Sequence, residues 1–257
     1  MGELLSWGDS AKVNNFKGAL TLSVVFDHSE PQATNIISFW FKPDKPVDYT
    51  AGQFIEIRLP HDNADKRGNK RWFTLSSSPS EELIAITTKF AAENGSSFKE
   101  TLRNLKPGVE VEISQPMGDF VLPKDPSIPL VFVAGGIGCT PMRSMIRWLL
   151  DNDEQRAIQL LYSVNTLEEV AFKDLFKSYK LDMQIIPNNP PANWEAPSGR
   201  LDAAKILQII GNDGLENKQF YISGPEPMIE ALENGLKSAD ISKKHLISDF
   251  FPGYTEV

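Results

Sequence analysis

The segment from Leu130 to Pro141, LVFVAGGIGCTP, constrains the fold more than any other part of this chain. Its five leading apolar residues are too few for a helix and run directly into Gly135 and Gly136, which predicts a short buried strand of a parallel sheet. Thr140 suits the N-cap of a following helix, and Pro141 suits the first turn. Apolar residues then recur at helical spacing: Met142, Met145, Ile146, Leu149 and Leu150.

A strand–glycine–helix turn of this kind has two interpretations. It leaves backbone N–H groups and the positive end of a helix at the carboxyl edge of a parallel sheet, where a nucleotide pyrophosphate binds and glycine lets it approach closely. Alternatively, the glycines serve the geometry of the turn alone. The third glycine of the common dinucleotide fingerprint is absent, so the turn by itself leaves both interpretations open.

Composition excludes several classes of function. The 257 residues predict two modest domains, and the net charge of -8 argues against a nucleic-acid-binding protein, which needs a basic face. The single cysteine, Cys139, excludes an internal disulfide and a four-cysteine iron–sulfur or zinc site built from this chain alone. The histidines lack metal-ligand spacing, so we expect no metal site. No apolar run reaches the ~18 residues of a membrane span and no signal peptide is evident, which predicts a cytoplasmic protein.

Strand and turn signals alternate through residues 16–118, which predicts an all-β N-terminal domain, either a barrel or a sandwich. A single helix is expected from about Ser97 to Leu105. Runs that are rich in β-branched and aromatic residues, or that alternate apolar with polar residues, mark strands at 20–26, 36–41, 54–59 and 109–113.

Three prolines between Leu122 and Pro129 predict a stiff linker, because proline restricts both itself and the residue before it. We therefore place the domain boundary here, with domains at 1–122 and 123–257. Beyond the linker, strands alternate with helices, which is typical of a doubly wound parallel sheet. The strands are expected at 130–134, 158–163, 183–186 and 219–223, and the helices at 141–150, 167–179, 202–210 and 227–238.

Three further segments carry chemistry. In the first, Arg71 offers a bidentate fork to phosphate, Phe73 lies on the same strand face and can stack on a flat ring, and Thr74 can bond the ring edge. The alternative is an ordinary strand, with Arg71 solvated and Phe73 in the core. In the second, Ser96 and Ser97 open a helix, either as an anion site or as simple caps.

The third segment, Phe220 to Met228, ends a strand in Ser-Gly-Pro and starts a helix at Pro227. This turn is expected at the carboxyl end of a sheet strand, beside the first glycine turn. The alternative is a turn chosen for its geometry alone.

In order and spacing, these segments resemble the ferredoxin–NADP reductase superfamily in its two-domain form without a fused iron–sulfur domain. The resemblance implies an N-terminal antiparallel β-barrel flavin domain, followed by an α/β doubly wound parallel-sheet nucleotide domain. The matching segments are Arg71–Thr74 for the motif Arg-x-Tyr-Ser/Thr, Gly95–Ser97 for the flavin-diphosphate loop, Gln115–Phe120 for Gly-Pro-x-Gly-x-Phe, Gly135–Pro141 for Gly-Gly-x-Gly-x-Thr-Pro, Ser223–Met228 for Cys-Gly-Pro-x-x-Met, and Asp249–Tyr254 for an acidic–aromatic tail.

The resemblance also implies roles for single residues. Thr74 at the flavin N5 edge, with Ser223 and Asp249 near the nicotinamide, would be the catalytic residues. The residues implied to bind FAD are Arg71, Phe73, Thr74, Leu75, Thr88, Phe90, Gly95, Ser96 and Ser97. Those implied to bind the nicotinamide nucleotide are Gly136, Gly138, Thr140, Pro141, Ser163, Asn165, Gly224, Pro225 and Met228.

Three positions depart from the family pattern. Phe73 stands where the family usually has Tyr, and Ser223 stands where it has Cys. Asn165 stands where many NADPH-using members have Arg, and Glu168 and Glu169 follow it. A 2′-phosphate needs a base at this point, so we expect NADH in preference to NADPH, with Arg143 or Arg200 as alternative sources of charge.

The function expected from this resemblance is a flavin-dependent NAD(P)H oxidoreductase that moves a hydride from nicotinamide to FAD. Electrons would then pass to an external acceptor such as a ferredoxin, a flavodoxin or an oxygenase component. The basic segment from Lys66 to Arg71 either steers such an acidic carrier or is simply solvated. The alternatives are a non-catalytic electron-relay subunit of a larger complex, which the altered Phe73 and Ser223 leave open, and a free-flavin reductase.

Overall fold

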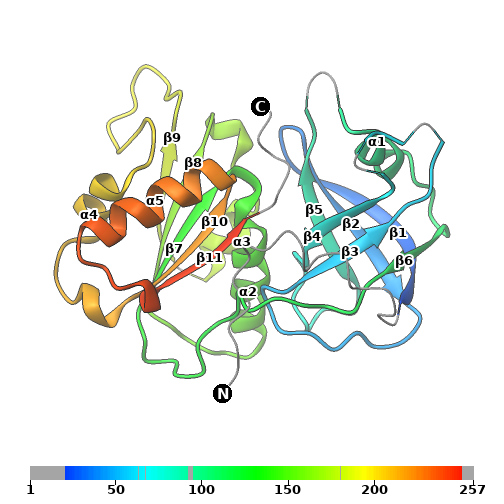
Figure 1. Cartoon of the computed structure of the whole chain (residues 1–257), viewed down its shortest axis with the longest axis horizontal. Coiled ribbons are helices and arrows are strands. Elements are labelled where there is room, and N and C mark those ends of the chain that lie inside the picture. Colours follow the sequence, from blue (N-terminus) through cyan, green and yellow to red (C-terminus); the bar gives the residue numbers. More distant parts are fainter. Residues whose placement is uncertain (1–20, 63, 67, 92–94, 180, 251–257) are drawn as a thin grey trace.

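The computed structural model describes residues 21–62, 64–66, 68–91, 95–179 and 181–250. Figure 1 shows two sheet-based halves side by side, a barrel in the N-terminal half and an open sheet in the C-terminal half. Within these described ranges, no helix has the length and apolar character that a membrane crossing requires.

The N-terminal half is a six-stranded antiparallel sheet that closes into a barrel, as the sequence predicted. An isolated antiparallel bridge between Leu75 and Ile86 joins the two outer strands. Side chains such as Ile55 and Phe39 fill the interior, because alternate residues of a strand face the same side. In the order β4-β3-β6-β1-β2-β5, the strands are β1 (Leu22–Ala33), β2 (Ile36–Pro43), β3 (Phe54–Arg58), β4 (Lys70–Thr74), β5 (Ile84–Lys89) and β6 (Glu110–Ile113), with the helix α1 (Ser97–Arg103).

The C-terminal half is a five-stranded, all-parallel sheet in the order β11-β10-β7-β8-β9. Its strands are β7 (Leu130–Gly135), β8 (Ile158–Val164), β9 (Asp182–Pro187), β10 (Gln219–Gly224) and β11 (Leu246–Phe250). Its helices are α2 (Thr140–Asp151), α3 (Lys173–Ser178), α4 (Ala203–Ile210) and α5 (Glu226–Ser238), and its short 3₁₀ helices are η2 (Gly136–Cys139), η3 (Leu167–Glu169), η4 (Leu215–Asn217) and η5 (Lys243–His245).

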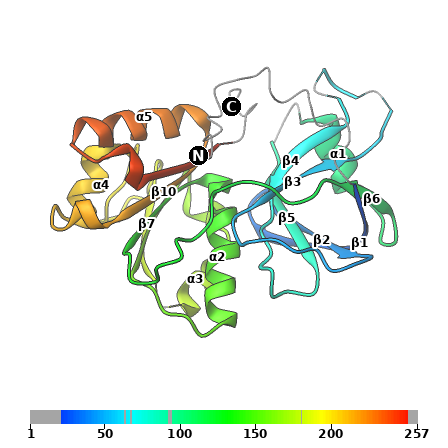
Figure 2. The ribbon, with the colours of Figure 1, turned by 60° about the horizontal axis from the view of Figure 1, so that its bottom comes forward.

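Helices cover both faces of this sheet. Phe132 of β7 packs in one core with α2 and α3, whereas its neighbours Val131 and Val133 pack in a second core with α4 and α5. Alternation along a strand explains the division, since successive side chains point to opposite faces. Figure 2 shows α2 between the parallel sheet and the barrel, with α4 and α5 on the far side of the sheet. The prediction of a doubly wound sheet is confirmed.

The helix expected at 167–179 is wrong in its first half. The chain forms η3, then runs in an extended conformation at Val170, and begins α3 only at Lys173, with Phe172 at a φ of 58°. Val170, Ala171 and Phe172 are all buried in the core shared with α2. The segment therefore leaves the helical path because burial of these three side chains outweighs local helix propensity.

Two smaller features also differ from expectation. β11 was not predicted as a strand, although it adds a fifth parallel strand beside β10. Thr140 is the first residue of α2 and not its N-cap, because η2 runs directly into the helix. Its hydroxyl accordingly donates to the carbonyl of Ile137 instead of accepting from a helical N–H.

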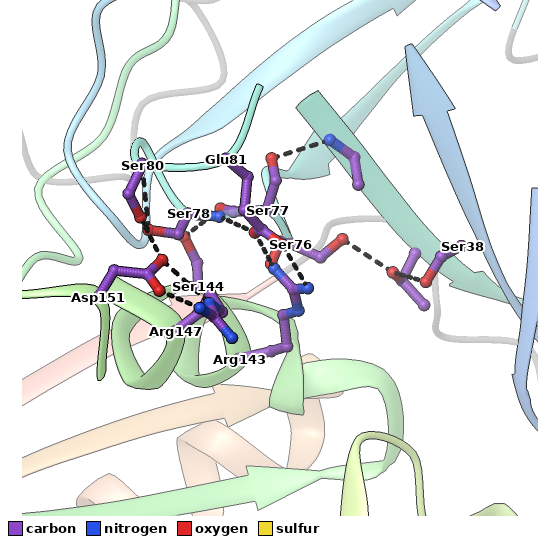
Figure 3. A network of polar contacts seen from close by, with 12 residues as sticks. Ser38, Ser76, Ser77, Ser78, Ser80, Glu81, Arg143, Ser144, Arg147 and Asp151 are labelled. Atoms are coloured by element: carbon purple, nitrogen blue, oxygen red, sulfur yellow. Dashed lines mark hydrogen bonds and ion pairs between the residues drawn. The ribbon is translucent and has the colours of Figure 1, made fainter. Parts of the chain in front are cut away.

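The two halves share polar contacts along α2, which Figure 3 shows from close by. The Arg143 guanidinium donates to the carbonyl of Ser76 at 3.0 Å and forms an ion pair with Glu81. The Ser144 hydroxyl donates to the carbonyl of Ser77. These contacts hold residues 76–81, which follow β4, against α2.

Apolar packing also crosses the junction. Phe120 stands 5.2 Å from Tyr221, centre to centre and nearly edge-on, and belongs to the core of the C-terminal half. Gly52 lies so close to this segment that a Cβ would come 2.0 Å from the Phe120 carbonyl oxygen and 2.6 Å from Met145 Cε. The placement of the domain boundary after Leu122 stays a prediction.

We expect Gly52→Ala to destabilise the protein by about 3 kcal/mol or more, for two reasons. The added Cβ would clash with the main chain of Phe120, and alanine rarely adopts the positive φ of this position. Gly108→Ala is the matched control, since Gly108 also has a positive φ but an added Cβ meets nothing within 4 Å. It should cost about 1 kcal/mol. Urea unfolding of both variants measures the difference, and equal losses would contradict the close approach at Gly52.

Candidate functional site

Two glycine turns that are far apart in the sequence pack against each other. A Cβ on Gly138 would lie 2.2 Å from the main-chain oxygen of Ser223, and one on Gly135 would lie 2.4 Å from the sulfur of Met228. Close packing therefore explains these two glycines. Gly136 differs, because its φ is +53° and nothing lies within 4 Å of an added Cβ. Of the three, Gly136 leaves the open approach that a bound nucleotide would need.

The carboxyl edge of the sheet brings Ser223 beside Asp249. The two are partners across the parallel pairing of β10 with β11, so their side chains leave the same face. Ser223 is fully buried, and both its Oγ and the Oδ2 of Asp249 are buried without a hydrogen-bond partner among the described residues. Burial raises the pKa of Asp249 to about 7, because the carboxylate loses its hydration. This edge therefore holds a carboxyl group that changes charge near neutral pH.

A second pair of unpartnered hydroxyls lies in the barrel. Thr74 ends β4 and Thr88 lies in β5, the two outer strands that the Leu75–Ile86 bridge joins. Both side chains are almost fully buried, and neither Oγ1 has a partner in the described part of the chain. By contrast, the adjacent Thr87 hydroxyl bonds Ser38 at 2.7 Å and Ser76 at 2.8 Å.

Unpartnered polar atoms of this kind are costly, so each requires an explanation. In the described residues, five buried side-chain atoms lack a partner, and the fifth is Trp40 Nε1. The other four belong to Thr74, Thr88, Ser223 and Asp249, which the sequence had assigned to catalysis or cofactor binding. Polar edges of a flavin and a nicotinamide would satisfy such atoms, so these residues fit the two groups.

The residues expected at the flavin phosphates also come together, and they hold a partner that the sequence did not reveal. Arg71 Nη2 lies 2.8 Å from Asp65 Oδ1 and 3.5 Å from Ser96 Oγ. Ser96 Oγ donates to Asp65 Oδ2 at 3.3 Å, and Ser97 Oγ accepts from the Asp65 backbone N–H at 3.0 Å. Gly95 is exposed beside this group, and a Cβ there would meet the Glu100 carboxylate.

Three residues assigned to flavin contact lie mainly in the barrel core. Phe73 is 6% exposed and packs on Phe98, with ring centres 5.9 Å apart. Leu75 and Phe90 are also buried, and the Arg103 guanidinium lies over the Phe90 ring at 4.2 Å. Their contacts with a flavin stay predictions.

The strand ends nearest the glycine turn carry the residues assigned to nucleotide specificity. Ser163 is 8% exposed and pairs with Gly135 across β7 and β8. The exposed Asn165 accepts a hydrogen bond from Asn188 through its Oδ1 at 3.2 Å. Glu169 forms an ion pair with Lys89 of the barrel at 2.7 Å. Lys89 and Glu169 thus link the two halves near this edge, a contact that sequence reasoning missed.

The other assigned residues complete the edge. Gly224 packs against Gly135, Pro225 immediately precedes α5, and Met228 lies in its first turn. Pro141 lies in the first turn of α2. Arg143 is committed to the contact with Glu81, whereas Arg200 is exposed. Of the expected acidic–aromatic tail, residues 251–254 lie outside the described residues.

Cys139 lies beneath the glycine turn and is fully buried. The Tyr162 hydroxyl donates to its sulfur at 3.1 Å. Burial raises the pKa of this thiol to about 12. The side chain is therefore part of the packing below the turn and remains a neutral thiol.

Comparisons with known proteins agree with this architecture. Residues 132–234 match the family model described as the oxidoreductase NAD-binding domain. The chain also has the fold of the FAD/NAD-binding domain of nitric oxide dioxygenase from Vibrio cholerae, with a TM-score of 0.76 and 22% identity over 90% of this chain and 98% of that one. The comparisons therefore show an NAD-binding domain at residues 132–234 and, for the chain as a whole, the fold of an FAD/NAD-binding domain.

Two curated relatives are more similar in sequence. Flavohemoprotein A of Dictyostelium discoideum is 27% identical over 252 residues, which cover 92% of this chain and 62% of that protein. The glycine betaine monooxygenase reductase subunit of Chromohalobacter salexigens is also 27% identical, over 84% of this chain and 60% of that protein. The chain therefore spans about three fifths of the length of these relatives.

Asp249 is expected to make the stability of the protein depend on pH. Its pKa is about 7 in the folded protein and near 3.8 when unfolded, so the folded state holds the extra proton between these values. The stabilisation is complete below the unfolded pKa and is lost as pH rises through the folded one. Between pH 5 and pH 8, the free energy of unfolding should fall by about 2–3 kcal/mol through this group.

Asp249→Asn should remove most of that decline. Urea unfolding of the wild type and the variant at pH 5 and pH 8 measures it. Asp44→Asn, in an exposed turn, is the control and should keep the wild-type slope. Parallel pH profiles for the wild type and Asp249→Asn would show that the carboxyl does not titrate in this range.

Proposed function

We propose that this chain is an NAD(P)H-dependent flavoprotein reductase that binds FAD, oxidises a nicotinamide nucleotide and passes the electrons to an external acceptor. The observation that carries the proposal is the set of four unpartnered buried atoms on Thr74, Thr88, Ser223 and Asp249. Thr74 and Thr88 lie in β4 and β5 of the barrel, and Ser223 and Asp249 lie in β10 and β11 of the parallel sheet; η2 contacts both β5 and β10. FAD supplies a ring that accepts a hydride from the nucleotide and releases electrons singly.

On the flavin side, the residues of this chain bind and orient. The Arg71 guanidinium, whose Nη2 now pairs with Asp65, is the group that would bind a phosphate, and the Ser96 and Ser97 hydroxyls belong to the same cluster. Thr74 Oγ1 is a buried donor and acceptor at the end of β4, suited to the polar edge of the ring. Rigid placement of this kind lowers the barrier by aligning the reacting groups.

On the nucleotide side, Gly136 offers open backbone for the diphosphate. Ser223 presents a buried hydroxyl to the nicotinamide and substitutes for the sulfur of the family's cysteine. Asp249 lies beside Ser223, where its carboxyl can hold a proton near neutral pH. Ser223 Oγ and Asp249 Oδ2 are already buried, so water is excluded from these groups.

The proposed nucleotide is NADH. Asn165 itself offers no charge to a 2′-phosphate, and Lys89, the nearby cation, is already paired with Glu169 at 2.7 Å. Arg143 is held by Glu81 at the junction, which leaves Arg200 as the base that the sequence offered.

Asn165→Arg should raise kcat/KM for NADPH by about tenfold, because a guanidinium recognises a phosphate bidentately, and leave the NADH value within about twofold. Asn217→Arg adds the same charge in η4, just before the opposite end of β10, and should change neither. Steady-state reduction of a small dye measures both. An unchanged NADPH value in Asn165→Arg would argue against this position as the specificity site.

The acceptor is proposed to be a separate protein. The single cysteine rules out a four-cysteine cluster within this chain, and the reductase subunit of a monooxygenase among its relatives supports a protein acceptor. The basic segment from Lys66 to Arg71 contributes less positive charge than its sequence suggests. Lys70 pairs with Glu56 at 2.8 Å, and Arg71 pairs with Asp65.

An anaerobic visible spectrum of the FAD-loaded protein tests the function directly. We expect flavin bands that bleach rapidly on addition of NADH and more slowly with NADPH. Bands that neither nucleotide bleaches would favour an electron-relay subunit instead. A protein that takes up no FAD would overturn the flavoprotein assignment.

A further inference from the structure

Asp65 occupies the group of donors that a flavin phosphate would need. Its Oδ1 lies 2.8 Å from Arg71 Nη2, and its Oδ2 accepts from the Ser96 hydroxyl at 3.3 Å. Its backbone N–H donates to Ser97 Oγ at 3.0 Å. All three residues expected at the diphosphate therefore already contact one acidic residue of the same half.

A carboxylate and a phosphate use the same chemistry at such a site, because both present anionic oxygens to a guanidinium and to hydroxyls. They cannot share it, since two anions in contact repel each other strongly. A phosphate that binds Arg71 and Ser96 must therefore displace the Asp65 side chain.

The surrounding contacts allow this exchange without unfolding the segment. The main chain at Asp65 is held by Ser97 and by the Gly68 N–H, which donates to the Asp65 carbonyl at 2.8 Å. Arg71 is anchored separately, by the Gly68 carbonyl at 2.9 Å and by the Phe98 ring at 5.2 Å. The carboxylate can thus rotate away while both its own backbone and the guanidinium stay in place.

The ion pair is only partly shielded from water. The Asp65 side chain is 27% exposed and that of Arg71 is 15% exposed. Water can therefore hydrate the Asp65 carboxylate when it leaves Arg71, and the carboxylate can return when the phosphate dissociates.

We propose that Asp65 is an internal competitor for the flavin diphosphate, which holds the phosphate-binding residues in place without FAD and weakens FAD binding. This inference rests on the proposed function. Because of this competition, bound FAD would exchange with free FAD in solution and would not be held permanently.

Titration of the apoprotein with FAD, followed by flavin fluorescence, tests the proposal. Asp65→Asn removes the charge but keeps the size of the side chain, and should tighten FAD binding by about threefold to tenfold. Asp62→Asn is the matched control, because Asp62 is an exposed acid of the same loop, and should change the affinity by less than twofold. Riboflavin, which has no phosphate, should bind all three proteins equally.

The outcomes separate this inference from the proposed function. FAD that binds Asp65→Asn as tightly as the wild type, or more weakly, overturns the competitor role and leaves the flavoprotein assignment standing. An equal gain for riboflavin also overturns it, because the effect would not act through the phosphate. Failure of every protein to bind FAD overturns both proposals.

Asp65→Ser provides a second variant if Asp65→Asn does not fold, as judged by urea unfolding. It should show the same gain for FAD and for inorganic pyrophosphate. If neither variant folds, Asp65 is a structural anchor of the loop and the proposal is overturned.

Discussion

The close contact between two stretches of backbone determines the rest of this molecule. Gly138 lies against the main chain of Ser223, and Gly135 against Met228, so the turn after β7 and the turn after β10 form one layer. This contact holds together the carboxyl edge of the sheet, where the pairing of β10 with β11 places Ser223 beside Asp249. Because α2 follows this turn and also contacts the barrel, the geometry of the junction depends on the lack of a Cβ at Gly135 and Gly138.

Much of this architecture could be predicted from the sequence, because periodicity and turn chemistry are local properties. The four expected parallel strands lie where their apolar runs placed them, and the short alternating segments predicted an all-β half, which the family resemblance specified as an antiparallel barrel. Thr74, Ser223 and Asp249 came from the family resemblance, and each carries a buried polar atom without a partner in the described structure. Their catalytic roles stay predictions.

The features that sequence reasoning missed depend on distant contacts. Asp65 meets Ser96 across 31 positions, which no local pattern reveals. The break before α3 follows from burial of Val170 to Phe172, which overrides a plausible helical pattern. β11 is a short edge strand that contains both Ser248 and Asp249, so its sequence lacks the apolar run of a central strand.

The buried thiol of Cys139 has a consequence for the proposed flavin chemistry. Reduced flavins react with oxygen to give peroxide, and peroxide attacks thiolates much faster than thiols. The sole cysteine of this chain is enclosed beneath the glycine turn and has a pKa of about 12, so at neutral pH almost none of it is thiolate. Its one thiol is therefore not poised for oxidation or for redox signalling, and a cysteine introduced on the surface would be the only reactive thiol for a spectroscopic label.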